Sequence, residues 1–266
     1  QVRIRALSTT GQAGPWSDTY DVRRAEGPRV LVVDGNDRWA ADGLGPHAWA
    51  AWNGFSINEC GVSFDSCANE AVIAGGVSLA DYDAVIWVLG EESTSQDTFD
   101  ATEQALVQSY LQNGGRLFVT GAEVGWDLDH SGAGLAFYNN YLKASFAADD
   151  SQGIYTVQGE TGSIFEGMAF DFGQSPGSPY NIQYPDTVNP VQGGQTALRY
   201  SESLVAAVQF AGLFPSGTAE GRMVYIAFPF ETIYPESTRH EVMRRVLDFF
   251  GLIPEPPAQV QAWSMY

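Results

Sequence analysis

The sequence is poor in positive charge, in cysteine and in long apolar runs. Its 266 residues include 13 Lys and Arg against 32 Asp and Glu, which gives a net charge of −19. Binding of nucleic acid, or of an anionic membrane surface, needs basic side chains that neutralise phosphates, so the composition excludes both as expected partners. No run of 18 apolar residues occurs, so no membrane-spanning segment is expected. The acidity suits calcium, cationic or neutral ligands, or solubility in salt.

The two cysteines, Cys60 and Cys67, lie seven positions apart. This spacing is compatible with a disulfide that closes a small loop, with two unrelated thiols, or with half of a metal site. No further Cys or His lies nearby at the spacing of a zinc site, which disfavours the metal.

Three apolar runs, at 29–34, 84–90 and 116–121, have the composition of strands buried on both faces of a parallel sheet. Residues 97–113 carry apolar side chains at helical spacing, and two glycines follow them, which predicts a helix and its end. Strand, helix and strand in this order form a right-handed βαβ unit. A strand at 223–228 and an amphipathic helix at 237–250 extend the pattern, which indicates an α/β fold.

Shorter alternating segments flank and interrupt this pattern. Residues 2–24 alternate around a turn rich in Gly and Pro, which predicts a β-hairpin that resembles the last two strands of a fibronectin type III module. Residues 151–215 predict a β-rich insertion of antiparallel strands and loops. The chain starts at Gln1 without a signal-like stretch, and we interpret it as a piece of a multidomain protein. We therefore expect a fibronectin type III remnant at 1–26, an α/β domain at 28–252 and a linker at 253–266.

Ligands of open parallel sheets bind beyond the carboxyl ends of the strands. Polar residues follow each predicted strand, and together they form the candidate site: Asp34, Asn36, Asp37 and Arg38 after the first strand, Glu91 and Glu92 after the second, Glu123, Trp126, Asp127, Asp129 and His130 after the third, and Glu231 after the last. Acidic residues at strand ends also cap helices and form turns, and a loop histidine is usually solvated, so each residue has a purely structural interpretation as well.

Residues 116–126 carry the most informative motif. An apolar strand runs into the sequence Gly121-Ala122-Glu123-Val124-Gly125. This pattern is typical of a nucleophile elbow, a sharp strand-to-helix turn that raises one side chain above the sheet. The raised residue is Glu123, where a hydrolase would carry Ser or Cys. We expect Glu123 to have a strained backbone, with the glycines on either side allowing close packing.

The elbow and the terminal sequence Phe228-Pro229-Phe230-Glu231 resemble the class I glutamine amidotransferase-like family, whose fold is flavodoxin-like. The resemblance implies a mostly parallel sheet flanked by helices. The family's catalytic Cys falls at Glu123, its His at Pro229 and its Glu at Glu231. Release of ammonia from glutamine needs a thiolate paired with an imidazole, so we expect no glutaminase activity.

A closer resemblance covers residues 28–252. Five segments, at 30–35, 66–72, 81–93, 121–129 and 228–231, resemble a subfamily found in secreted bacterial multidomain proteins labelled as xanthan lyases or cell-wall amidases. The resemblance implies an extracellular or cell-surface location and neighbouring domains of the parent chain as partners. In such an oxidising location, a disulfide between Cys60 and Cys67 is expected.

Three functions follow from these observations. The first is a catalytically silent accessory domain that binds a glycan or a partner domain, with Asp34, Asn36, Glu91, Glu92, Trp126 and Asp127 as ligand-binding candidates. The second is a carboxylate-based hydrolase in which Glu123 and Glu231 form an acid/base pair, or a glycosidase pair if held roughly 5–9 Å apart. The third is a calcium-binding module, because Asp127-Leu128-Asp129 resembles a fragment of a calcium loop. No cofactor other than calcium is expected.

Overall fold

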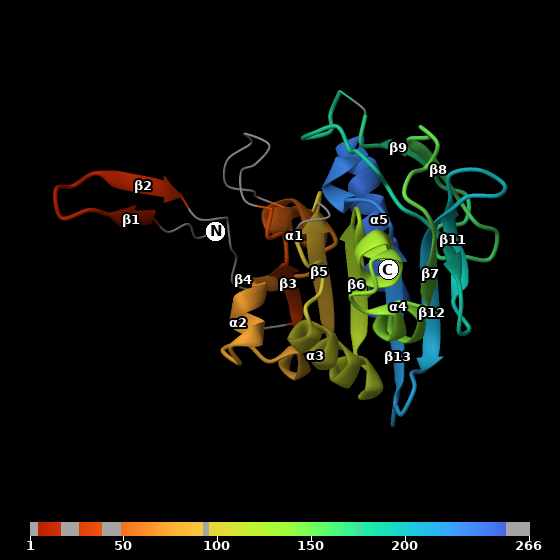
Figure 1. Cartoon of the computed structure of the whole chain (residues 1–266), viewed down its shortest axis with the longest axis horizontal. Coiled ribbons are helices and arrows are strands. Elements are labelled where there is room, and N and C mark those ends of the chain that lie inside the picture. The colour runs from red at the N-terminus through yellow and green to blue at the C-terminus, as the bar shows by residue number, and fades with distance from the viewer. Residues whose placement is uncertain (1–4, 17–26, 39–48, 93–95, 175, 254–266) are drawn as a thin grey trace, which may run out of the picture.

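The computed structural model describes residues 5–16, 27–38, 49–92, 96–174 and 176–253 (Figure 1). These residues form two sheets. The smaller one is the antiparallel pair of β1 (Arg5–Leu7) and β2 (Ala13–Trp16). The rest of the expected hairpin, residues 2–4 and 17–24, lies outside the described residues, and the fibronectin type III assignment stays a prediction. The larger sheet has 12 strands.

Five parallel strands form the centre of the larger sheet. In sheet order they are β4 (Phe64–Ala68), β3 (Val30–Asp34), β5 (Ala84–Gly90), β6 (Arg116–Gly121) and β13 (Glu220–Ile226). Numbered along the chain, this order is 2-1-3-4-5, the flavodoxin-like order. The fold is therefore mixed α/β with a parallel central sheet, as the sequence predicts. The strand order reverses between β3 and β5, so their carboxyl ends are where a ligand is expected.

Seven more strands extend the sheet beyond β13 with antiparallel pairing. They are β7 (Ala144–Ala148), β8 (Thr156–Gly159), β9 (Ala169–Phe172), β10 (Thr187–Pro190), β11 (Gln195–Arg199), β12 (Val205–Leu213) and β14 (Ile233–Tyr234). The long strand β12 joins the two parts, because it pairs with β13 on one side and with β11 and β10 on the other.

Helices cover both faces of the parallel strands. They are α1 (Trp49–Glu59), α2 (Asn69–Ile73), α3 (Ala101–Gln112), α4 (Leu135–Tyr141) and α5 (Glu236–Phe249), with single turns η1 (Leu79–Asp81), η2 (Trp126–His130) and η3 (Phe230–Thr232). A capping box between Asp100 and Glu103 begins α3, and Gly114, with a φ of +87°, follows its end. Among the described residues, no helix has the length and apolar composition of a membrane span.

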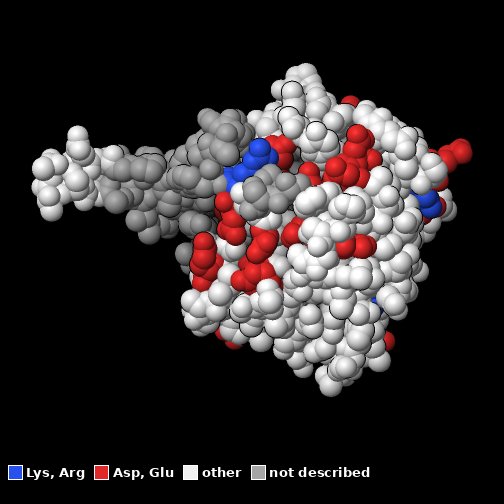
Figure 2. All heavy atoms as spheres, in the orientation of Figure 1, with Lys and Arg blue, Asp and Glu red and all other residues white. Residues whose placement is uncertain are grey.

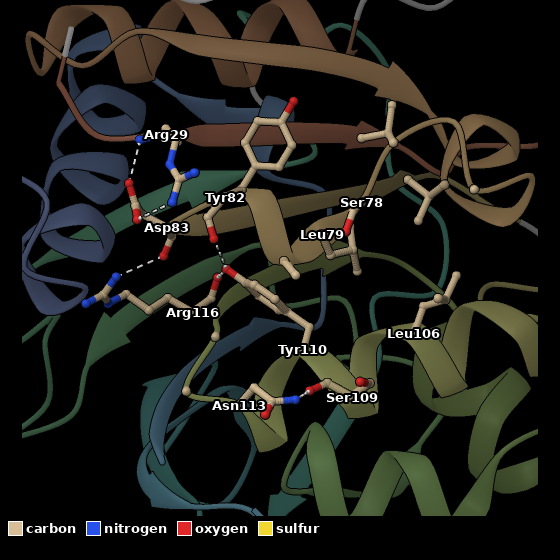
Figure 3. Close-up of a pocket in the computed structure, with 16 residues that line it drawn as sticks. Arg29, Ser78, Leu79, Tyr82, Asp83, Leu106, Ser109, Tyr110, Asn113 and Arg116 are labelled. Carbon is tan, nitrogen blue, oxygen red and sulfur yellow. Dashed lines mark hydrogen bonds and ion pairs between the residues drawn. The ribbon is translucent and has the colours of Figure 1, made fainter. Parts of the chain in front are cut away.

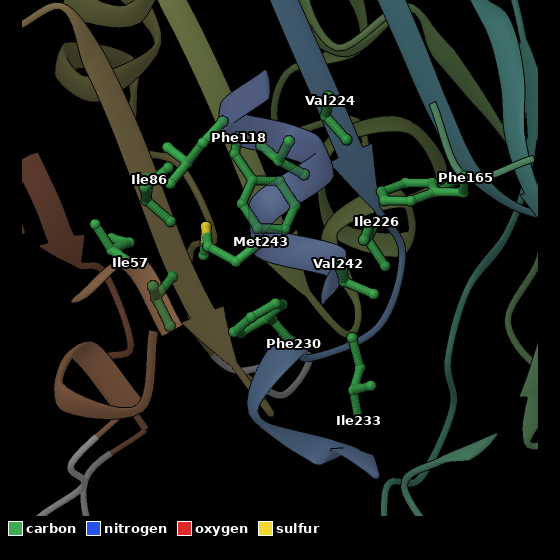
Figure 4. Packing of buried hydrophobic residues seen from close by; sticks show 14 of the residues in the cluster. Ile57, Ile86, Phe118, Phe165, Val224, Ile226, Phe230, Ile233, Val242 and Met243 are labelled. Carbon is green, nitrogen blue, oxygen red and sulfur yellow. The ribbon is translucent and has the colours of Figure 1, made fainter. Parts of the chain in front are cut away.

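The core consists of one apolar layer on each face of the sheet. Helices α1 and α5 pack on one face, where Met243 and Val242 of α5 lie against Ile86, Phe118 and neighbouring strand residues (Figure 4). Helices α2, α3 and α4 supply the layer on the opposite face, which also contains Trp87. Successive residues of β3 alternate between the layers, with Val32 in the first and Val33 in the second. Burial on both faces explains why the central strands read as continuous apolar runs.

The prediction of a disulfide between Cys60 and Cys67 is wrong. Both Cys60 and Cys67 are free thiols. Cys60 packs against the layer that contains α1, and Cys67 packs against the layer on the other face of the sheet. The sheet therefore separates the two sulfur atoms. Burial raises the pKa of the Cys60 thiol to about 11 and that of Cys67 to about 12, so both are protonated at neutral pH.

We expect thermal unfolding of this chain to be insensitive to reductant. Without a disulfide, no covalent loop restricts the unfolded chain, so dithiothreitol should leave the melting temperature unchanged within error. Calorimetry with and without the reductant measures this. A drop of several degrees on reduction would show that a disulfide forms in solution.

Candidate functional site

Glu123 lies on a nucleophile elbow, as the sequence predicts. Strand β6 ends at Gly121, helical backbone begins at Val124, and Glu123 between them has a φ of +63°. A β-carbon on Gly121 would lie 2.6 Å from the β-carbon of Leu89, and one on Gly125 would lie 2.6 Å from the Tyr138 hydroxyl. Any side chain at these positions would clash, so both glycines are needed for the turn.

The segment between β9 and β10 runs past the elbow. The backbone N–H of Gln183 donates to Glu91 Oε1 at 3.1 Å, beyond the end of β5. Three residues later, Asp186 Oδ2 accepts the N–H of Gly125 at 2.6 Å and that of Trp126 at 3.4 Å. We call residues 183–186 the strap, because these bonds join it to the loops after two neighbouring strands. The strap occupies two N–H groups at the start of the helical segment after the elbow, where an anionic ligand would otherwise bind.

The side chain of Glu123 is largely buried. The residue is 6% exposed, and its Oε2 atom has no hydrogen-bond partner among the described residues. The pKa of Glu123 is raised to about 7, chiefly by burial and also by the charges of Asp149 and Glu91, while Arg38 lowers it. The environment of Glu123 therefore favours the protonated form.

Glu231 lies at the carboxyl end of the neighbouring strand and is also buried. Thr120, at the end of β6, fixes this turn because its hydroxyl donates to the carbonyl of Phe228 at 2.8 Å and accepts the N–H of Phe230 at 2.7 Å. Glu231 is 0% exposed, and the Tyr180 hydroxyl donates to its Oε1 at 2.6 Å. Burial raises the pKa of Glu231 to about 7, although the bond from Tyr180 lowers it.

Glu91 links the two buried carboxylates. Its charge raises the pKa of both Glu123 and Glu231, and its Oε2 lies 3.6 Å from Arg38 Nη1. Glu91 and Glu123 therefore share Arg38, whereas the positive charge acting on Glu231 is that of Arg239, whose Nη1 donates to the Glu231 backbone carbonyl at 3.3 Å. Figure 2 shows acidic side chains spread over the face of the molecule in view, with few basic ones between them.

Glu92 points elsewhere, although it follows Glu91 directly. It is buried, its Oε1 accepts the N–H of Asp37 at 2.7 Å, and burial raises its pKa well above the ordinary value. The nearest charges are those of Asp37, Glu103 and Asp127, on the side of the sheet covered by α3. The acidic residues that the sequence predicts as one site therefore form two separate groups, one around Glu91 and one around Glu92.

Asp34 and Asn36 form the turn after β3. The Asn36 N–H donates to Asp34 Oδ1 at 3.4 Å, and the Asn36 side-chain amide donates to the carbonyl of Leu89 at 2.9 Å. These bonds tie the loop after β3 to β5. The structural interpretation of Asp34 as a turn residue therefore applies. Trp126 is half-buried and its ring packs against the exposed His130, with 5.7 Å between ring centroids.

Asp127 and Asp129 do not form a calcium loop. Asp127 Oδ2 accepts both the N–H and the hydroxyl of Thr98, at 2.9 and 2.8 Å, and Asp129 Oδ2 accepts the N–H of Phe146 at 2.7 Å. Each carboxylate thus fastens η2 to a different neighbouring segment. Within the described ranges, no three Asp, Glu, His or Cys side chains are placed to hold a metal ion.

Two residues of the site were missed by the sequence interpretation, Tyr180 and Asp186. Both belong to the insertion, whose fold could not be predicted from strand and helix patterns. Asp186 is fully buried, and the ring of Tyr180 packs against that of Trp49, with 5.2 Å between ring centroids. Nothing in their local sequence indicates that they reach residues 61 and 51 positions away in the chain.

No protein-family model matches the sequence, and no curated protein matches it. Solved structures do show the same fold. A β-galactosidase from Rahnella sp. R3 superposes with a TM-score of 0.57 at 15% identity, over 86% of this chain and 32% of that chain. A ThuA-like protein from Parabacteroides merdae has a TM-score of 0.51 at 8% identity, over 87% and 93%. A glutamine amidotransferase from Thermotoga maritima has a TM-score of 0.42 at 14% identity, over 85% and 86%.

These identities show the fold alone. The chain spans about a third of the length of the β-galactosidase that it matches. The same α/β fold therefore occurs both as most of a ThuA-like protein and as one part of a longer glycosidase.

Proposed function

We propose that this chain is a non-catalytic accessory domain of a secreted multidomain protein, and that it binds a glycan at the carboxyl edge of its parallel sheet. The observation that carries the proposal is the closed elbow: Glu123 is 6% exposed and Glu231 is 0% exposed. Both carboxylates are largely buried, and Tyr180 occupies one oxygen of Glu231, so neither is presented to a substrate as an open active site would present it. The rigid edge around them remains available for binding.

The chemistry of the elbow supports the same conclusion. A glutaminase needs a thiolate and an imidazole in these two places. The chain has Glu123 and Pro229 there, and both cysteines lie elsewhere, protonated and partly buried in the apolar layers. The nearest histidine after the elbow is His130, an exposed residue whose ring packs on Trp126 and Phe146.

The occurrence of the fold within a β-galactosidase supports a role beside glycan-active domains. Trp126 supplies the contact surface that a glycan needs, because sugar rings pack their apolar faces on aromatic side chains. It is half-buried, and its backbone N–H is held by Asp186. The binding face would therefore be rigid before the ligand arrives, which reduces the entropy lost on binding.

One observation favours a carboxylate-based hydrolase as the second candidate. A pKa of about 7 allows Glu123 to hold and release a proton at neutral pH, as a general acid must. Its suggested partner Glu231 is sealed by Tyr180 and faces the same obstacle. Catalysis would require Tyr180 to release the Glu231 carboxylate.

We expect soluble bacterial polysaccharides to retard the wild-type chain in native gels, and Trp126→Ala to abolish most of this retardation. The substitution removes the aromatic face while leaving the strap's hydrogen bond to the backbone N–H. Affinity electrophoresis against xanthan and cell-wall polysaccharide measures the effect. The matched control is Phe55→Ala, because Phe55 is 48% exposed on α1 and contacts His240 of α5.

Equal retardation of Trp126→Ala and wild type would place the binding surface elsewhere. Hydrolysis of glutamine by the wild-type chain, measured as ammonia release, would contradict the non-catalytic role outright.

A further inference from the structure

A pocket of about 580 Å³ opens at the edge of the sheet opposite the elbow (Figure 3). Three segments form it: residues 72–83 between α2 and β5, the second half of α3 with the turn after it, and Arg29 before β3. The volume is within the range of small-molecule sites. Neither the elbow nor the strap contributes to it, so the pocket is independent of the proposed function.

One end of the pocket is positively charged. Arg29 and Arg116 lie on either side of Asp83, as Figure 3 shows. Arg29 Nη2 lies 3.5 Å from Asp83 Oδ1, and Arg116 Nη1 donates to the Asp83 backbone carbonyl at 3.0 Å. These are the charged residues that line the pocket, so one positive charge is left over. In a chain with a net charge of −19, such an excess is unusual.

The lowered pKa of Asp83 is consistent with an excess of positive charge at this end of the pocket. Burial alone would raise this pKa, but the hydrogen bonds from Arg29 and the charges of Arg29 and Arg116 lower it below its ordinary value. The Arg29 side chain is also 46% exposed. It can therefore form a further hydrogen bond to an incoming anion without leaving Asp83.

The other end of the pocket is apolar. Leu79 and Leu106 face each other across it in Figure 3, and Val72 and Val77 complete this wall. Between the two ends stands the ring of Tyr110, whose hydroxyl lies 3.3 Å from the backbone carbonyls of Tyr82 and Arg116. The hydroxyl is thus engaged with the protein, and the ring presents its apolar face.

We propose that this pocket binds a small organic carboxylate with an aromatic or aliphatic body. The carboxylate would accept hydrogen bonds from Arg29, because a guanidinium presents its donors in the geometry of a carboxylate, while Arg116, on the other side of Asp83, would contribute its positive charge. The body of the ligand would lie along Tyr110 toward Leu79 and Leu106. One ligand would then contact both the charged end and the apolar end of the pocket.

The probe for this proposal is phenylacetate, titrated into the full chain by isothermal titration calorimetry. Two probes of similar shape control for charge: neutral 2-phenylethanol and cationic phenethylamine. We expect phenylacetate to bind at millimolar or lower concentration, 2-phenylethanol to bind about 10-fold more weakly, and phenethylamine to show no binding.

Two variants locate the site, and one controls for net charge. Arg116→Gln removes the guanidinium that has no carboxylate partner among the described residues, and should weaken phenylacetate binding about 10-fold. Ser109→Trp, at an exposed position of α3 on the pocket wall, should block binding by filling the space. Arg244→Gln makes the same charge change on α5, where Arg244 pairs with Glu241, and should leave affinity within about 2-fold of wild type.

Absence of phenylacetate binding up to 10 mM (about 10-fold above the 1 mM scale of weak ligands) would overturn the proposal. It would also be overturned if Arg116→Gln and Ser109→Trp both bound as wild type does, or if 2-phenylethanol bound as tightly as phenylacetate. Circular dichroism of each variant distinguishes a lost site from a lost fold.

Discussion

The free energy of unfolding is expected to fall as the pH rises from about 4.5 to about 7. Burial raises the pKa of Glu103, Glu123 and Glu231 from 4.5 to about 7 in the folded chain. The folded state therefore keeps protons that the unfolded chain releases, and the stability they provide is complete below about 4.5 and lost as the pH passes 7. Each group contributes at most about 3 kcal/mol. Urea denaturation at half-unit steps of pH measures the slope.

Replacing one carboxylate at a time by an amide shows which residues cause the dependence of the unfolding free energy on pH. Glu123→Gln and Glu231→Gln remove one titrating carboxylate each, so each should make the curve flatter and raise stability at pH 8. Glu202→Gln, an exposed position, serves as the matched control and should leave the slope as it is. Glu241 has its pKa lowered to about 2, chiefly by hydrogen bonds from Arg244, so its contribution is lost only in acid below this window. A stability that stays constant or rises from pH 4.5 to 7 would contradict the burial of these groups.

Asp186→Ala is expected to destabilise the chain by about 3 kcal/mol. The substitution removes the acceptor of the Gly125 and Trp126 N–H groups and leaves a cavity in a fully buried place. The strained backbone of Glu123 would lose its support on the helical side. Urea denaturation should show a lower midpoint with an unchanged m-value.

Two further variants distinguish the loss of the strap's hydrogen bonds from the loss of an acidic side chain in general. Asp186→Asn keeps an acceptor oxygen of the same size, so it should destabilise the chain less than Asp186→Ala. Asp171→Ala removes an exposed aspartate of β9 and should cost less than about 0.5 kcal/mol. Hydrogen exchange at Gly125 and Trp126 should accelerate in Asp186→Ala alone among the three. Unchanged exchange there would show that the strap does not hold the elbow.

The parallel part of the fold could be predicted because its signals are local. Runs such as 84–90 are apolar throughout, since both faces of β5 are covered, and the helix expected at 97–113 is present as α3 (Ala101–Gln112), shortly before Gly114 and Gly115. The elbow was also predictable, because a tight turn with φ of +63° at Glu123 requires glycines at fixed positions around it. Spacing along the chain was sufficient in each case.

The site itself depends on contacts that spacing does not encode. Cys60 and Cys67 are close in sequence, yet a strand of the sheet carries one of them to the opposite face. Glu91 and Glu92 are adjacent, yet they join different groups of charges. Asp186 reaches the elbow from an insertion of short strands and loops, where composition predicts only an irregular β-rich segment. The burial of Glu123 and Glu231 follows from these long-range contacts, which no local pattern encodes.

The measurement that tests the non-catalytic role most directly is a turnover assay with the purified chain. Wild type and Glu123→Gln are incubated at pH 5, 6 and 7 with xanthan, galactan and peptidoglycan, and the release of reducing ends and free amines is followed. The closed elbow predicts that both proteins match the buffer blank at every pH. Release by the wild type that disappears in Glu123→Gln, while the two have the same fold by circular dichroism, would show that the carboxylate is catalytic.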